Sequence, residues 1–156
     1  MSKTLLAVVA VCATSIACSA FAEAPRSPTP VSSPSPFKVT TVAEGLQNPW
    51  GLALLPDGRM LVTERPGRMR LISRDGKLSE PLTGIPKVAA SGQGGLLDVT
   101  LSPTFAQDQL VYWSFAEEGD GGAGTAVARG RLGESSIDDA KVIWRQTPKE
   151  IGRAHV

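Results

Sequence analysis

The 156-residue sequence predicts an all-β fold made of short antiparallel strands. Apolar and polar residues alternate with period two in several runs, such as Met60–Glu64 and Met69–Ser73, as is typical of strands with one buried face. Turn-forming residues bound these runs, and the chain holds 16 glycines and 12 prolines. No sustained helical period appears within residues 37–149, where we expect at most one helical turn, at Ser135–Ala140.

The amino-terminal residues predict export to the periplasm. Lys3 gives a positive start, an apolar stretch follows, and a small-residue pattern ends at Ala22 as signal peptidase requires. We therefore expect a signal peptide over residues 1–22. No later segment approaches the roughly 20 apolar residues that a membrane span needs, so no span is expected after cleavage. Both cysteines, Cys12 and Cys18, lie in this signal, which excludes disulfides and a cysteine-ligated metal from the mature domain.

Two further segments are not expected to belong to the folded domain, which we place at residues 37–149. Residues 23–36 are mostly proline, serine, alanine and threonine, a composition that predicts a flexible linker. Residues 150–156, read back into codons, reproduce a widely used sequencing adapter, so we interpret them as an artefact that includes the only histidine, His155. Between the signal peptide and this tail, 14 basic and 14 acidic residues balance, which predicts no nucleic-acid partner.

The strands follow one another through recognisable turns. A short apolar run, Leu52–Leu55, leads through Pro56-Asp57-Gly58 into the strand Met60–Glu64. In such a triplet proline presets φ, aspartate bonds its own backbone and glycine accepts a positive φ. A Pro-Gly pair then turns the chain into Met69–Ser73, and an Asp-Gly turn closes that hairpin.

The same arrangement recurs further along the chain. Gly51–Pro56 and the strand after it are echoed by Gly95–Pro103 and the strand Leu110–Trp113, and in each copy a third strand carries spaced arginines. The final prolines of the two runs lie 47 positions apart, within the length of one four-stranded blade of a β-propeller. We therefore predict a little over two blades, with a β-sandwich as the alternative. Such a piece should expose apolar blade faces and unpaired edges, and so aggregate.

A more specific pattern begins at Gln93. The segment Gln93–Val99, taken with Leu101–Phe105 and Leu110–Tyr112, resembles the soluble glucose/sorbosone dehydrogenase family that uses pyrroloquinoline quinone (PQQ), in particular its aldose sugar dehydrogenases. The segments Leu46–Leu52 and Leu61–Arg65 resemble that family's first blade. The resemblance implies a six-bladed β-propeller that oxidises an aldose sugar to a lactone, with PQQ as hydride acceptor, calcium as a Lewis acid, and an external electron acceptor.

One functional role carries over to a residue of this chain. Gln93 matches the family glutamine whose side-chain amide contacts the cofactor, and an amide offers both a donor and an acceptor. Gly92, Gly94 and Gly95 would let the backbone approach a flat ring, whereas a turn that merely opens a strand is the alternative interpretation. The resemblance places the catalytic histidine and the calcium ligands beyond Lys149, so no catalytic or metal-binding residue is assigned here.

Other conspicuous residues have simpler interpretations. Trp50 begins a strand, which favours a core position over a sugar platform. Glu64 and Arg65 are interpreted as a pair between blades, and Asp98 either touches the site or is a buried carboxylate satisfied by backbone donors. The acidic segment Glu117–Gly122 is interpreted as a hairpin tip, because it lacks the ligand spacing of a calcium loop.

Two classes of function compete with a sugar oxidoreductase. One is a non-redox propeller hydrolase such as a metal-dependent lactonase, and the other is a propeller that only binds carbohydrate or protein. Only the oxidoreductase requires a histidine followed closely by Arg-Leu in the next blade. Only the oxidoreductase should reduce a dye when PQQ and calcium are added to the apo-protein.

Overall fold

The computed structural model describes residues 37–149. The predicted signal peptide (1–22), linker (23–36) and adapter-derived tail (150–156) lie outside the described residues. Within the described range, residues 39–149 belong to one compact unit. Its described part contains seven strands and one short helix, so the all-β prediction is confirmed. Within this part, no helix is both long and apolar enough to span a bilayer.

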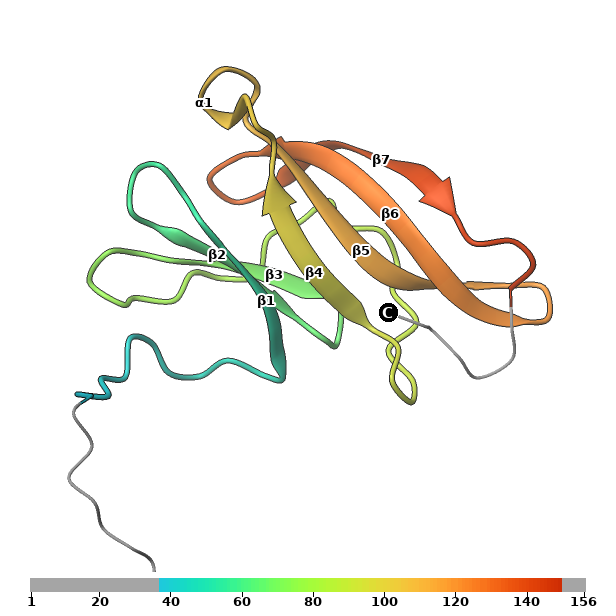
Figure 1. The fold of residues 1–156 in the computed structure, drawn as a ribbon, viewed down its shortest axis with the longest axis horizontal. Coiled ribbons are helices and arrows are strands. Elements are labelled where there is room, and N and C mark those ends of the chain that lie inside the picture. Colours follow the sequence, from blue (N-terminus) through green and yellow to red (C-terminus); the bar gives the residue numbers. More distant parts are fainter. Residues whose placement is uncertain (1–36, 150–156) are drawn as a thin grey trace, which may run out of the picture. The chain divides into compact units, whose positions relative to one another are not determined.

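The first sheet is a three-stranded antiparallel meander, shown in Figure 1, in the order β1 (Pro49–Leu54), β2 (Met60–Glu64) and β3 (Arg68–Ile72). The predicted Pro-Asp-Gly turn joins β1 to β2. There the Asp57 carboxylate accepts the Arg59 N–H at 2.9 Å, so the aspartate closes the turn on its own backbone as its chemistry predicts.

An irregular fourth segment completes this sheet. The predicted Asp-Gly turn forms after β3 and reverses the chain, with the Ser73 N–H donating to Lys77 O at 2.9 Å. The returning residues then run beside β3, where the Ser79 N–H donates to Leu71 O and the Leu82 N–H donates to Met69 O, each at 2.8 Å. The first sheet therefore has the four-segment form expected of a blade.

The second sheet is a four-stranded antiparallel meander. Its strands follow chain order: β4 (Leu96–Leu101), β5 (Leu110–Gly119), β6 (Gly122–Leu132) and β7 (Ile137–Arg145). The one-turn helix α1 (Phe105–Asp108) joins β4 to β5, and a tight turn joins β5 to β6 (Figure 1). The two sheets correspond to the two predicted blades.

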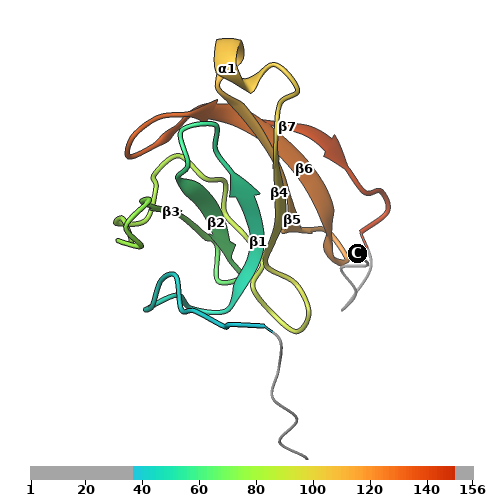
Figure 2. The same cartoon turned by 60° about the vertical axis from the view of Figure 1, so that its left-hand side comes forward.

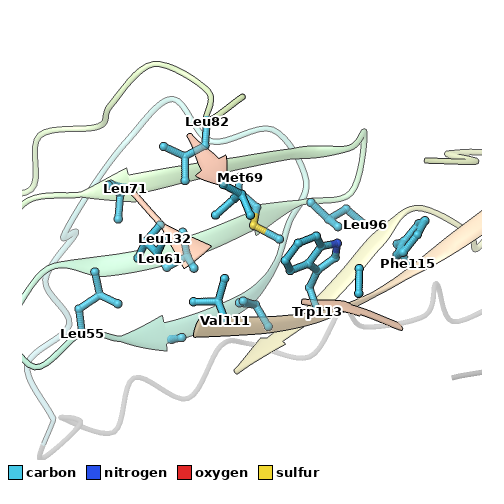
Figure 3. Close-up of a cluster of buried hydrophobic side chains, with 14 of the residues drawn as sticks. Leu55, Leu61, Met69, Leu71, Leu82, Leu96, Val111, Trp113, Phe115 and Leu132 are labelled. Atoms are coloured by element: carbon cyan, nitrogen blue, oxygen red, sulfur yellow. The ribbon is translucent and has the colours of Figure 1, made fainter. Parts of the chain in front are cut away.

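The first strands of the two sheets, β1 and β4, lie side by side, as both Figure 1 and Figure 2 show. The core fills the space between the sheets, and Figure 3 shows Met69 of the first sheet beside Trp113 of the second. The largest fully buried apolar side chains come from both sheets: Leu61, Val62, Met69, Leu96, Leu97, Val111, Trp113 and Phe115. Burial of apolar area between the sheets is therefore the main force that holds β1 against β4.

The position predicted for a helical turn is wrong. Ser135–Ala140 leads into β7, and the helical turn forms instead at α1. The reason is tertiary packing: Ile137 is 2% exposed, and its Cγ2 fills the space that a side chain at Gly130 would need. Pairing with β6 and burial of Ile137 thus override the weak local preference.

The expected exposure of an apolar blade face is confirmed for the described residues. Trp50, Leu52 and Leu54 alternate along β1 and are 51%, 54% and 69% exposed, so they share one uncovered face. The prediction that Trp50 lies in the core is therefore wrong for this structure. The core side of β1 is instead formed by Ala53, which is 8% exposed and packs with the second sheet's residues.

Candidate functional site

Gln93 lies on the loop that leads into β4, and it is exposed. The backbone on both sides of the loop is fixed to β5. The Ala89 N–H donates to Ala116 O, and the Ala116 N–H donates to Gly95 O, each at 2.8 Å. The backbone of a loop anchored at both ends loses little conformational freedom when the loop binds a ligand.

The three glycines around Gln93 differ in what a side chain at each position would contact. A Cβ at Gly94 would lie 2.7 Å from Ala89 O, and a Cβ at Gly95, where φ is +151°, would lie 2.5 Å from Arg65 O. Contacts within the chain therefore explain these two glycines without a cofactor. Gly92 differs from the other two. Its φ is +56°, but no atom lies within 4 Å of the position that a Cβ would occupy. Gly92 alone leaves the backbone beside Gln93 open to a ligand.

The first sheet also helps to hold the loop of Gln93. The Leu96 N–H donates to Arg65 O at 3.0 Å, so the backbone that follows β2 fixes the first residue of β4. Arg65 thus contacts the second sheet through its backbone and Cγ, close to Gly95. Together with the bonds to β5, this contact places the loop between the two sheets.

The predicted pairing of Glu64 with Arg65 is wrong. Glu64 is fully buried and instead pairs with Arg68, whose Nε lies 2.7 Å from Glu64 Oε2. The other carboxylate oxygen accepts the backbone N–H of Gln47. Glu64 ends β2 directly opposite Arg68, the first residue of β3, so their side chains meet, whereas Arg65 lies in the turn and bonds the second sheet through its backbone.

The acidic segment Glu117–Gly122 forms the hairpin between β5 and β6, as predicted. The Glu117 carboxylate lies 2.8 Å from Arg145 Nε and 2.7 Å from Lys149 Nζ. Hydrogen bonds from Arg145, and then from Lys149, lower the pKa of Glu117 below its ordinary value. Among the described residues, no group of His, Cys, Asp or Glu side chains is arranged to hold a metal ion.

A groove of about 270 Å³ lies next to the same end of β5. It is lined by Pro86, Lys87, Val88, Ala89, Glu117 and Glu118. The Lys87 ammonium lies 3.0 Å from the Glu118 carboxylate across it. The sequence pattern did not single out Lys87, because it belongs to a segment without strand or helix periodicity. Since Glu117 and Glu118 are engaged by cations, the groove is less suited to bind a ligand than the loop of Gln93.

Asp98 matches neither interpretation completely. Its Oδ1 accepts the Val99 N–H at 2.9 Å, as expected for a carboxylate satisfied by the backbone, but Asp98 is exposed rather than buried. Asp98 also lies against β1, because a Cβ at Gly51 would be 2.9 Å from Asp98 Oδ1. Its position marks the close approach of β1 and β4 and does not bring it to Gln93.

Comparison with known proteins identifies similar chains. Aldose sugar dehydrogenase YliI of Escherichia coli is 47% identical over 120 residues, which cover 74% of this chain and 32% of that protein. An uncharacterised protein of Synechocystis is 39% identical over 128 residues, which cover 76% of this chain and 31% of that protein. The chain therefore spans about a third of the length of these curated relatives.

Solved structures give the same result. The apo soluble aldose sugar dehydrogenase of Escherichia coli matches with a TM-score of 0.64 and 49% identity, over 67% of this chain and 31% of that one. The PQQ-bound aldose sugar dehydrogenase of Streptomyces coelicolor matches with a TM-score of 0.62 and 33% identity, over 71% and 34%. The family described as glucose/sorbosone dehydrogenase matches residues 46–156. The chain belongs to the glucose/sorbosone dehydrogenase family.

Proposed function

We propose that the full-length protein containing this chain is a periplasmic oxidoreductase that oxidises aldose sugars to lactones. PQQ is the proposed hydride acceptor, and an external acceptor takes the electrons. The similarity to aldose sugar dehydrogenases, one of them PQQ-bound, supports this proposal. The observation that carries it within this chain is the exposed Gln93 on a loop fixed to both sheets.

The residues of the loop fit one edge of PQQ. The Gln93 amide offers an N–H donor and a carbonyl acceptor, which suit the carboxylate and carbonyl groups of a quinone acid. Beside it, the open space at Gly92 leaves room for a planar ring against the backbone. Bound PQQ would supply the two-electron acceptor chemistry. Gln93 would orient the edge of the ring, and the loop's anchors would keep the amide in place.

The remaining parts of the proposed site belong to the rest of the full-length protein. We propose that residues beyond Lys149 supply the histidine base, the cofactor-binding cations and the calcium ligands. This chain would then contribute orientation of the cofactor, and the general base would act from another blade. The signal peptide predicted at residues 1–22 is the basis for the proposed periplasmic location.

The test uses the full-length apo-protein, titrated with PQQ in the presence of calcium, with dye reduction by an aldose as the readout. We expect activity to appear on reconstitution and Gln93→Ala to raise the PQQ Kd about tenfold, because a hydrogen bond to the ligand is lost. Gln107→Ala, an exposed glutamine on α1, is the matched control and should leave the Kd unchanged. A wild-type protein that gains no dye-reducing activity, or that hydrolyses lactones without PQQ, would refute the proposal.

A further inference from the structure

Thr63 of β2 is fully buried and bonds to the first strand of each sheet. Its Oγ1 accepts the Gly51 N–H of β1 at 2.8 Å and donates to Leu97 O of β4 at 2.5 Å. A second possible acceptor, Gly51 O, lies at 3.5 Å and is the weaker partner. One hydroxyl thus joins β1, β2 and β4 at the contact between the two sheets.

Both partners of Thr63 lie where regular strand pairing is interrupted. The register of β1 with β2 shifts between Pro49 and Leu52, around Gly51. The register of β4 with β5 shifts between Leu96 and Val99, around Leu97. Such irregularities displace backbone groups from the ladder, and buried backbone groups need another partner. The Thr63 hydroxyl supplies one for each strand.

The contact at Leu97 lies at the start of the strand that follows the loop of Gln93. Together with the bond from Leu96 N–H to Arg65 O, it fixes two successive residues of β4 to the end of β2 and the residue that follows it. We propose that Thr63 is a positioning residue that holds the Gln93 loop where the Gln93 amide can contact the cofactor. This inference rests on the proposed function, because it assigns Thr63 a role at the same site.

The experiment compares three variants of the full-length protein. Thr63→Val keeps the shape and removes the hydroxyl, whereas Thr63→Ser keeps the hydroxyl. Ser102→Ala is the matched control, because it removes another buried hydroxyl at the far end of β4, where Ser102 Oγ bonds Asp108 Oδ2 at 2.7 Å. We measure the PQQ Kd, the Tm, and kcat and KM for an aldose. If Thr63→Val does not fold, Thr63→Cys, with a weak S–H donor, replaces it.

A positioning role predicts an effect that a purely structural role does not. Thr63→Val should raise the PQQ Kd about three- to tenfold, Thr63→Ser should restore it, and Ser102→Ala should lower the Tm without changing the Kd. In a Gln93→Ala background, Thr63→Val should add no further rise, because the loop then has no amide to place. Equal Tm losses with an unchanged PQQ Kd in Thr63→Val and Ser102→Ala would overturn the inference.

Hydrogen exchange of the apo-protein separates this inference from the proposed function. In Thr63→Val, the amides of residues 90–97 should exchange faster than in wild type, while Ser102→Ala should leave them unchanged. If wild type binds no PQQ, the proposed function fails, together with the cofactor role of Thr63. If wild type binds PQQ and exchange at residues 90–97 is unchanged in Thr63→Val, the positioning of the loop by Thr63 is refuted alone.

Discussion

β1 and β4 occupy the same place in their sheets, and each follows a segment that contains a glutamine, Gln47 or Gln93. Each also carries a register shift near its first residues. The segment before β1 is held partly by side-chain chemistry: the buried Glu64 carboxylate accepts the Gln47 N–H and pairs with Arg68, while the Arg65 N–H adds a backbone bond to Asn48 O. The segment before β4 is held by backbone bonds to both neighbouring strands.

The difference shows how one architectural position can serve either packing or binding. Before β1, the Glu64–Arg68 pair helps to hold the chain in place, and the strand presents an apolar face with Trp50. Before β4, glycines allow the backbone to make the contacts itself, and the Gln93 side chain, exposed like that of Gln47, takes no part in them. A loop fixed by its backbone can present a functional side chain that takes no part in holding the fold.

The strongest test of this comparison is Gly95→Ala. A Cβ there would lie 2.5 Å from Arg65 O at a φ of +151°, so both a clash with backbone and conformational strain oppose it. We expect a loss of about 4 kcal/mol in the free energy of unfolding of the full-length protein. Urea denaturation monitored by tryptophan fluorescence measures it.

Gly92→Ala is the control for Gly95→Ala. Open space surrounds the Cβ position of Gly92, so only its φ of +56° opposes alanine. The expected loss in the free energy of unfolding is about 1 kcal/mol. Equal losses at Gly92 and Gly95 would contradict the conclusion that contact with Arg65 fixes the start of β4.

Glu64→Gln tests the side-chain arrangement before β1. The substitution keeps the shape but removes the charge that pairs with Arg68, whose Nη2 is already buried with no hydrogen-bond partner among the described residues. We expect the free energy of unfolding to fall by about 2 kcal/mol, because the partly buried Arg68 cation loses its charged partner. Glu80→Gln, at an exposed position, should change the free energy of unfolding by less than about 0.5 kcal/mol in the same urea titration.

Much of the fold could be predicted because turn chemistry and period-two patterns are local. The Pro-Asp-Gly turn and β2 formed as predicted, and the repeat correctly indicated two sheets. β7 was missed because Ile137 is buried by tertiary contacts, with the core cluster and against Gly130 of the neighbouring strand. Trp50 was misplaced because its exposure depends on which sheet covers β1, and that is not encoded near position 50.

The site was predictable only in part, for the same reason. The family resemblance identified Gln93, and its exposed position on an anchored loop agrees with a binding role. The role of Thr63 depends on two register shifts in strands distant in the sequence, and no local pattern reveals them. The pairing of Glu64 with Arg68 likewise depends on the register of β2 with β3, which sets the two residues opposite each other.

The comparison also predicts a pH effect at the strand that holds the β4 loop. Hydrogen bonds from Arg145 and Lys149 lower the pKa of Glu117, so its stabilisation is present above the ordinary value of 4.5 and is lost as the pH falls from there through the lowered pKa. We expect Glu117→Gln to lower the free energy of unfolding by about 1 kcal/mol at pH 7 and to change it little below pH 3. Urea titrations between pH 7 and pH 3 measure it, and a constant difference would contradict the assignment.

The two substitutions with the smallest expected effect on stability compare the two glutamines directly. Gln47 and Gln93 are both exposed, so Gln47→Ala and Gln93→Ala should each change the free energy of unfolding by less than about 0.5 kcal/mol. Gln47 keeps its contact with Glu64 as alanine, because that contact uses the backbone N–H. Only Gln93→Ala should weaken PQQ binding, measured by fluorescence titration. An equal loss of affinity in Gln47→Ala would show that the segments before β1 and β4 both belong to the cofactor site.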